Sequence, residues 1–370
     1  MTKPTAADVP VSQGYAMPAE WEPHESTWIA WPHNKEDWPG KFSPIPWVYT
    51  EIIRILARGE RVNIFIKGLK RIGRALDKLD SAGVEVARLR LIPARTNRVW
   101  TRDTGPTFLV NPGAAEPGER RALLDWKFNG WAKYDDHEHD DRLPRRVQDV
   151  LDLRTWEPRV EVEGSRKRVV MEGGAIDVNG RGTLLTTEEC LLSEVQQRNP
   201  FLDRAGYERL FADYLGIRHV IWLGQGIDGD DTHGHVDDLA RFVGPSTVVT
   251  VVEPRASDVN HERLEDNHRR LREARDQDGQ PLTIVTLPMP APVVFEGQRL
   301  PASYANFYIA NGVVLVPTFN DPNDRVALNT LADLFPDRQV IGIHSLDLVL
   351  GLGTLHCLSQ QEPAIPGGSG

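Results

Sequence analysis

Apolar residues recur at intervals of three and four positions in six segments of the chain, which is the spacing of an amphipathic helix. Two of these segments run into a glycine, Gly59 in one and Gly83 in the other, and glycine favours the end of a helix. The predicted helices lie within residues 47–59, 68–83, 136–153, 199–216, 260–279 and 324–337.

Short runs rich in β-branched residues separate these helices and read as strands. They cover residues 61–68, 84–93, 219–224, 282–288 and 339–345. Strands that alternate with helices along a chain are typical of an α/β fold.

A weaker repeat lies over this alternation. Four segments each run from polar residues through an apolar strand to a Gly, Asn or Pro turn, and they follow one another at roughly 65 to 70 residues. These segments are 102–113, 172–187, 235–253 and 304–320. We interpret residues 24–32 and 354–361 as the two halves of a fifth unit, which would close a ring.

Closure of a ring has a chemical consequence. In a cyclic array the residues that open equivalent strands converge on one axis. In this chain those residues are Asp103, Glu172, His235 with Asp237, and Cys357. The pattern therefore predicts that they meet in one site.

Composition and charge narrow the kinds of partner. The chain has 370 residues, of which 40% are hydrophobic and 26% charged, as in folded globular proteins. A formal net charge of −10 argues against nucleic acid and anionic membranes as partners and favours a small cationic ligand. No apolar run reaches the roughly 18 residues that a membrane span needs. A homo-oligomer is compatible with the sequence.

The two cysteines, Cys190 and Cys357, cannot build a disulfide framework, and the N-terminus lacks the apolar core of a secretory signal. We therefore expect a reducing cytoplasmic location, where thiols stay reduced. Residues 1–14 and 363–370 are rich in Pro, Gly and small polar residues and are predicted to be disordered tails. Between them, residues 15–362 are predicted to form a single domain.

Cys357 is the candidate nucleophile because it follows a glycine-punctuated stretch and stands beside His356, whose positive charge would promote a thiolate. The alternative is a small buried apolar side chain. Cys190, in "TTEECLLSEV", lacks comparable neighbours in the sequence and is interpreted as structural.

The segment "DDTHGHVDD" gathers histidines and carboxylates. If it is a strand, its alternation places His233, His235 and Asp237 on one face. One interpretation is a divalent-metal site of a zinc or iron hydrolase. A second is acid–base catalysis by a histidine next to a carboxylate that binds substrate, and a third is a solvated acidic loop.

Asp103 and Glu172 each follow an apolar run and precede a glycine turn. Together with His235, Asp237 and Cys357 they suit one electrophile, a guanidinium. Carboxylates clamp this flat cation through paired hydrogen bonds, and a thiolate then attacks its central carbon. A histidine protonates the departing nitrogen and later activates water.

The chain resembles the agmatine deiminase (agmatine iminohydrolase) family of guanidine-modifying enzymes over nearly its whole length. The matching motifs are "MPAEWEPHESTWIAWP", "WTRDTGPTFLV", "MEGGAIDVNGRGTLLTTEECLL", "GHVDDLARF", "LPASYANFYIANGVVLVP" and "LHCLSQQEPA". This resemblance implies a five-bladed α/β propeller with pseudo-fivefold ββαβ repeats and a central active site. It also implies hydrolysis of agmatine to N-carbamoylputrescine and ammonia, without metal or organic cofactor.

The resemblance further implies a role for each matching residue. Cys357 is then the covalent nucleophile, His235 the general acid and base, and Glu172 its assistant. Asp103 and Asp237 hold the guanidinium, and Trp100 lines the pocket.

The chain departs from the family pattern at several positions: Ala175, Asp177, Asp238, Arg241 and Thr354, and in "FNGWAKY", which lacks an expected double glycine. An arginine near the site would favour a guanidine that carries a carboxylate. The alternatives are therefore deimination of free arginine, a guanidino acid or peptidyl-arginine. Two other functions also remain possible from the sequence. One is a metal-dependent hydrolase that uses His233, His235 and Asp237, and the other is a binding protein without catalytic activity.

Overall fold

The computed structural model describes residues 9–365 and has a mixed α/β fold. In this part of the chain, four sheets share one plan: two antiparallel strands, then a helix, then a third strand that is parallel to the second. The first comprises β4 (Thr107–Val110), β5 (Arg121–Leu124) and β6 (Arg154–Trp156). The second comprises β9 (Asp177–Val178), β10 (Thr183–Thr187) and β11 (His219–Leu223).

The other two sheets repeat this plan later in the chain. One comprises β12 (Ala240–Gly244), β13 (Thr247–Val252) and β14 (Thr283–Pro288). The other comprises β17 (Tyr308–Ala310), β18 (Val313–Thr318) and β19 (Gln339–His344). The predicted repeat of strand pairs is therefore confirmed by the pairing of the strands.

A fifth sheet joins the two ends of the described chain. Its strand order is β20 (Gln360–Pro363), β1 (His24–Ala30), β2 (Arg61–Ile66) and β3 (Leu89–Pro93). β20 pairs with β1 in antiparallel register, with Gln360 opposite Trp28. The indole nitrogen of Trp28 also donates a hydrogen bond of 2.8 Å to Glu362. The predicted union of the first and last strand segments is thus confirmed.

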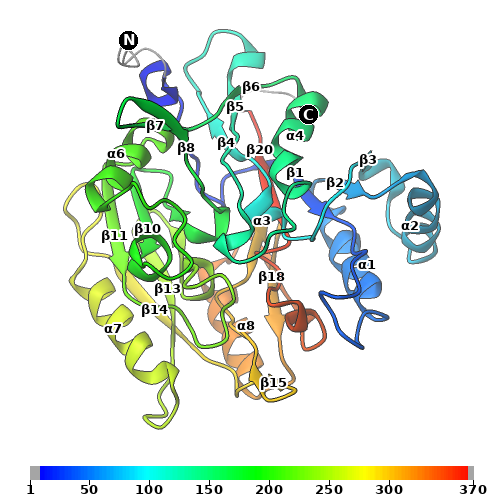
Figure 1. The fold of residues 1–370 in the computed structure, drawn as a ribbon. Coiled ribbons are helices and arrows are strands. Elements are labelled where there is room, and N and C mark those ends of the chain that lie inside the picture. Colours follow the sequence, from blue (N-terminus) through cyan, green and yellow to red (C-terminus); the bar gives the residue numbers. More distant parts are fainter. Residues whose placement is uncertain (1–8, 366–370) are drawn as a thin grey trace.

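The six predicted helices are confirmed: α1 (Ile45–Leu56), α2 (Leu69–Ser81), α4 (Leu143–Leu151), α6 (Arg204–Leu215), α7 (Asn260–Glu273) and α8 (Asn323–Leu334). Their spacing of apolar residues decides which face is buried. In α1, for example, Ile45, Tyr49, Ile52 and Leu56 are buried in the core. Figure 1 shows helices such as α1, α4, α6 and α7 towards the outside and the short α3 (Thr101–Thr104) near the middle.

Two antiparallel hairpins were not predicted. They are β7 (Arg159–Val162) with β8 (Ser165–Arg168), and β15 (Val294–Phe295) with β16 (Gln298–Arg299). Their strands have only two to four residues each, and β8 and β16 are entirely polar, so the hairpins give no strand-length apolar signal in the sequence. No helix in the described residues combines the length and apolar character needed to cross a bilayer.

The ends of the described chain are structured further out than predicted. Of the proposed tails, residues 1–8 and 366–370 lie outside the described part. Pro10–Gln13 forms a 3-10 helix, and the side-chain amide of Asn111 donates a hydrogen bond of 2.7 Å to the carbonyl of Gln13. At the other end, Pro363 belongs to β20. Tertiary hydrogen bonds override the local composition at both ends.

Candidate active site

A short turn precedes the first strand of each of the four repeated sheets and also precedes β20, and each of these turns carries a polar residue. Asp103 lies in α3 before β4, and Glu172 precedes the 3-10 helix Gly173–Ala175 that leads to β9. Asp237 lies in the 3-10 helix Val236–Asp238 before β12, and Asn306 lies in the turn before β17. Cys357 lies in the turn before β20. The first three turns pack on one another, α3 on the Glu172 turn and that turn on the Asp237 turn.

Three predicted carboxylates surround one histidine, His235. His235 Nδ1 lies 3.8 Å from an oxygen of Asp103 and 4.0 Å from an oxygen of Asp237. His235 Nε2 lies 3.7 Å from an oxygen of Glu172. All four side chains are buried. The predicted acids and imidazole therefore come together.

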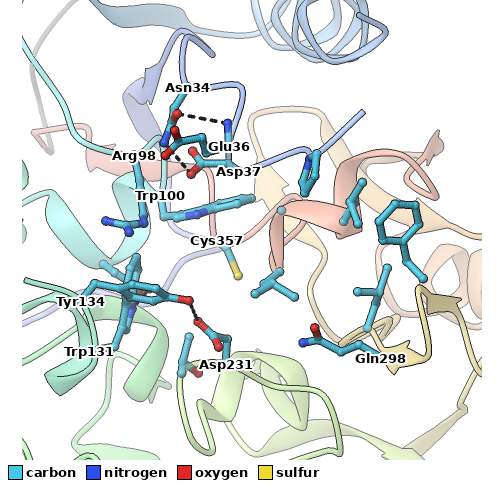
Figure 2. Close-up of a pocket in the computed structure, with 18 of the residues that line it drawn as sticks. Asn34, Glu36, Asp37, Arg98, Trp100, Trp131, Tyr134, Asp231, Gln298 and Cys357 are labelled. Carbon is cyan, nitrogen blue, oxygen red and sulfur yellow. Dashed lines mark hydrogen bonds between the residues drawn. The ribbon is translucent and has the colours of Figure 1, made fainter. Parts of the chain in front are cut away.

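The nucleophile candidate reaches the same cluster. Cys357 Sγ lies 3.7 Å from Asp237 Oδ2, and the amide nitrogen of Asn306 donates to it at 3.1 Å. Figure 2 shows its sulfur facing into a cavity beneath the ring of Trp100. Cys357, Trp100 and Asp103 all line this cavity, which has a volume of about 490 Å³. The structure thus brings together the six residues predicted for the site.

Glycine is required at two places in this arrangement. A Cβ added at Gly174 would lie 2.5 Å from His235 Nδ1 and 2.9 Å from Asp103 Oδ1. A Cβ added at Gly353 would lie 2.9 Å from the Trp100 ring and 3.0 Å from the Cβ of Cys357. Any larger residue would displace the imidazole in the first case and the thiol or indole in the second.

A buried ionic network fixes Asp237, and sequence reasoning missed most of it. His356 Nδ1 bonds to Asp237 Oδ2 and Nε2 to Glu20 Oε2, each at 2.7 Å. Because a carboxylate only accepts hydrogen bonds, both ring nitrogens donate and His356 is an imidazolium. Burial alone would raise the pKa of Asp237, but the hydrogen bond and charge of His356 hold it below its usual value. Glu20 lies within the quoted "MPAEWEPHES" segment, yet nothing local marks it.

Four of the five residues that depart from the family pattern bond to one another or to a shared partner. Arg241 Nε donates to Asp177 Oδ2 at 2.5 Å, and Arg241 Nη2 lies 2.9 Å from Glu20. Asn306 bonds to the other two, donating to Asp238 Oδ1 at 3.0 Å and accepting from the Thr354 hydroxyl at 2.7 Å. Arg241 is neutralised and does not line the cavity. The prediction that it would attract a carboxylate is therefore wrong.

Two further readings of the sequence are corrected. Residues 232–235 form a turn rather than a strand, with φ of 65° at His233 and 93° at Gly234, so alternation does not apply. His233 bonds to Ser193 at 3.2 Å and lines another cavity, away from His235 and Asp237.

Cys190 was interpreted as structural because it lacks partners in the sequence, but it has partners in the fold. Its sulfur forms a group with Glu172 and His235, and the potential ligand atoms of the three residues all lie within 4.8 Å of one another.

The segment "FNGWAKY" stores backbone strain beside the site. Trp131 and Ala132 adopt φ of 56° and 54°, a region that glycine occupies at lower cost. The conformation aims the Trp131 indole, which donates a hydrogen bond of 2.9 Å to Asp103 Oδ2. A second donor, the Gly174 amide, bonds to Asp103 Oδ1 at 3.0 Å.

The electrostatics of the cluster suit a cationic ligand. Burial, with repulsion from Asp237 and Glu172, raises the pKa of Asp103 to about 6 against the attraction of His235. Burial acts to lower the pKa of His235, but Asp103 and the Cys190 and Glu172 side chains outweigh it and hold that pKa well above its usual value. His235 is therefore cationic at neutral pH. Burial and the carboxylates Asp237, Asp238 and Asp103 raise the pKa of Cys357 well above its ordinary range.

Alkylation by neutral iodoacetamide should report this state of Cys357. Because its pKa is raised, the thiolate is scarce at neutral pH, so the rate of alkylation should be slow there and should rise as the pH is raised. Mass spectrometry of the modified peptide measures the rate, and a Cys357→Ser variant identifies any reaction at Cys190. Fast alkylation of Cys357 that does not change with pH would contradict the assignment.

Carboxylates also crowd the outer part of the cavity. Its acidic lining residues besides Asp103 are Glu36, Asp37, Asp136, Asp231 and Glu296. Arg98 is the one Lys or Arg in the described lining, and its charge is met by Asp136 at 2.9 Å. Burial, with repulsion from Asp136, raises the pKa of Asp37 to about 7 against the pull of Arg98. Figure 2 shows Asp231 at the cavity, bonded to the Tyr134 hydroxyl at 2.6 Å.

Comparison with known proteins gives one consistent family. A model described as Porphyromonas-type peptidyl-arginine deiminase matches residues 16–363. The agmatine deiminase of Ectopseudomonas mendocina is 34% identical over 386 residues, which cover 98% of this chain and 99% of that protein. The agmatine deiminase of Enterococcus faecalis superposes with a TM-score of 0.85 at 31% identity, covering 96% of this chain and 97% of that one. A C. jejuni agmatine deiminase solved with substrate bound gives 0.81 at 26% identity, covering 94% and 96%.

Proposed function

Because the chain belongs to the Porphyromonas-type peptidyl-arginine deiminase family, and to the agmatine deiminases within it, we propose that it hydrolyses agmatine to N-carbamoylputrescine and ammonia. The observation that carries this proposal is the convergence of Cys357, His235 and three carboxylates in one buried cluster, which reaches the cavity through Cys357 and Asp103. The reaction so proposed uses no metal or organic cofactor.

The proposed first step is capture of the guanidinium by Asp103 and Asp237. The two carboxylates crowd each other in the free protein, so a cation between them relieves their repulsion. The same cation opposes the negative charges that raise the pKa of Cys357, so the thiol loses its proton as substrate binds. Trp100 forms one wall for the flat substrate group.

The proposed chemistry then proceeds through a covalent adduct. The Cys357 thiolate forms a C–S bond to the guanidinium carbon, giving a tetrahedral adduct. The imidazolium of His235 donates its proton to the departing nitrogen, the C–N bond breaks, and ammonia leaves. His235, now neutral and held by Glu172, then takes a proton from a water molecule while the water oxygen attacks the same carbon. The C–S bond then breaks as the new hydroxyl group releases its proton to solvent, so the urea forms and the thiolate returns.

The tail of the substrate is the point on which alternatives differ. Agmatine ends in an amine, whereas free arginine and guanidinobutyrate carry a carboxylate. The outer cavity carries a net negative charge even though Asp136 and Asp231 pair with Arg98 and Lys133, so it attracts the amine and repels the carboxylate. This distribution favours agmatine over a guanidino acid. Peptidyl-arginine, for which the family model is named, has no charge at the corresponding point and lies between them.

Ammonia release from agmatine, butylguanidine, guanidinobutyrate, free arginine and an arginyl peptide tests this ranking. We expect kcat/KM to be highest for agmatine, lower for butylguanidine, and lower again by at least about tenfold for guanidinobutyrate, because like charges then face each other. Raising the ionic strength should reduce the difference in kcat/KM between agmatine and guanidinobutyrate, because salt screens the charges. A higher kcat/KM for the arginyl peptide or for guanidinobutyrate than for agmatine would show that agmatine is not the preferred substrate.

We also propose that the five sheets are the blades of a propeller that residues 15–362 form as one catalytic domain. The shared sheet plan and the pairing of β20 with β1 support this arrangement. It gives a reason for the position of the site, because turns at equivalent ends of the blades would meet at the axis.

A further inference from the structure

A second group of side chains, distinct from the nucleophile, meets at His235. It consists of Glu172, Cys190 and His235, whose ligand atoms all lie within 4.8 Å of one another. Cys190 comes from α5 (Glu188–Leu192) and the other two from the turns that precede β9 and β12. All three side chains are buried.

Polar atoms of this group lack partners within the described residues. Both ring nitrogens of His235 and the Oε2 of Glu172 are buried without a hydrogen bond. Nε2 and Oε2 are 3.7 Å apart, which is too long for a hydrogen bond. Two ligands on a tetrahedral metal, with bonds of about 2.1 Å, lie roughly 3.4 Å apart. The separation therefore suits two ligands of one ion.

The surroundings hold these ligands as the surroundings of a metal site do. Nε2 of His235 faces Glu172 at 3.7 Å, whereas Nδ1 faces the Asp103 carboxylate at 3.8 Å, so Nε2 is the ring nitrogen placed for an ion. Arg198 donates to Glu172 Oε1 at 3.2 Å and leaves Oε2 free. The Thr187 hydroxyl accepts from the Cys190 amide at 3.0 Å and donates to the Gly234 carbonyl at 2.6 Å. This last pair fixes Cys190 relative to His235.

The donor atoms select the ion. One thiolate, one imidazole and one carboxylate are ligand types of zinc, whereas Mg²⁺ and Ca²⁺ prefer oxygen alone. We propose that Glu172, Cys190 and His235 form a regulatory zinc site, at which zinc displaces the protons of the His235 imidazolium and the Cys190 thiol into solvent. Zinc bound there occupies the imidazole and carboxylate that act on the leaving nitrogen and water, so it inhibits reversibly. The inhibition rests on the proposed deiminase function, whereas the binding does not.

Titration with Co²⁺ and with Zn²⁺ tests the site, in a Cys357→Ser background that removes the other thiol. We expect one equivalent of Co²⁺ to bind with a near-ultraviolet thiolate-to-cobalt charge-transfer band. Adding Cys190→Ser should abolish the band. Zinc affinity, measured by competition with a chromogenic chelator, should fall by more than the roughly 10- to 100-fold that loss of a ligand's hydrogen-bonding partner costs. Cys190→Ala serves as a second variant if serine impairs folding.

Activity provides a separate readout. In the protein with both cysteines, zinc should inhibit ammonia release from agmatine, and a chelator should restore the activity. The Cys190→Ser variant should be inhibited less by zinc, when its rate with zinc is compared with its rate without zinc. Equal zinc affinity with and without Cys190 would overturn the proposal. So would a cobalt band that appears in the protein with both cysteines but is missing in the Cys357→Ser variant. If agmatine is not the substrate, the cobalt titration still decides the site.

Discussion

Replacement of Cys357 by alanine is expected to abolish ammonia release from agmatine, lowering kcat by roughly 10⁴-fold or more, because no other group can form the covalent adduct. The fold should persist. The thiol is buried in the cavity wall, but its removal takes away a single sulfur and leaves the β20–β1 pairing untouched. Steady-state kinetics and circular dichroism measure the two effects.

A direct test of the same step is acid quenching of the active protein during turnover. Mass spectrometry should then detect an amidino group on the peptide that contains Cys357, and the alanine variant should show none. Calorimetry should still detect agmatine binding to the variant, since Asp103 and Asp237 remain. Turnover retained by Cys357→Ala would refute the mechanism.

The second large effect is expected for Asp237→Asn. Asp237 is buried and neutralises His356, so its loss removes one clamp on the guanidinium and leaves the imidazolium with a single carboxylate, Glu20. Breaking a buried ion pair typically costs about 3–5 kcal/mol. We therefore expect kcat/KM for agmatine to fall by at least about 100-fold, with weaker binding measured by calorimetry in the Cys357→Ala background.

Asp278→Asn is the matched control for this substitution. Asp278 pairs with Arg218 at 3.2 Å, but both side chains are 60% exposed, and such pairs contribute about 0–1 kcal/mol. The same chemical change should therefore leave agmatine kinetics close to those of the parent protein. An Asp237→Asn variant that behaves like this control would place Asp237 outside the pocket.

The sequence predicted those parts of the molecule in which a local pattern determines the structure. Apolar spacing identified the six longer helices, and the repeated strand pairs pointed to residues that meet although they are far apart in sequence. Asp103, Glu172, Asp237 and Cys357 could be found because each occupies a similar place in its unit, at the turn before a strand.

What could not be predicted depends on tertiary contacts or on an exact backbone conformation. Glu20 contributes to the site only because the chain folds its segment against His356 and Arg241. His233 was misplaced because a turn with positive φ replaces the strand that its grouping with His235 assumed. Cys190 was judged by its sequence neighbours, whereas its partners come from two other turns.

The pairing of β20 with β1 has a consequence for how the protein is made. During synthesis the fifth sheet, which contains β1, has an open edge until residue 363 has emerged from the ribosome, because its outer strand β20 is encoded after every other strand. The cysteine adjoins that last strand, so the nascent polypeptide has no assembled catalytic centre before then. Exposed β1 is also the segment that a chaperone would need to shield.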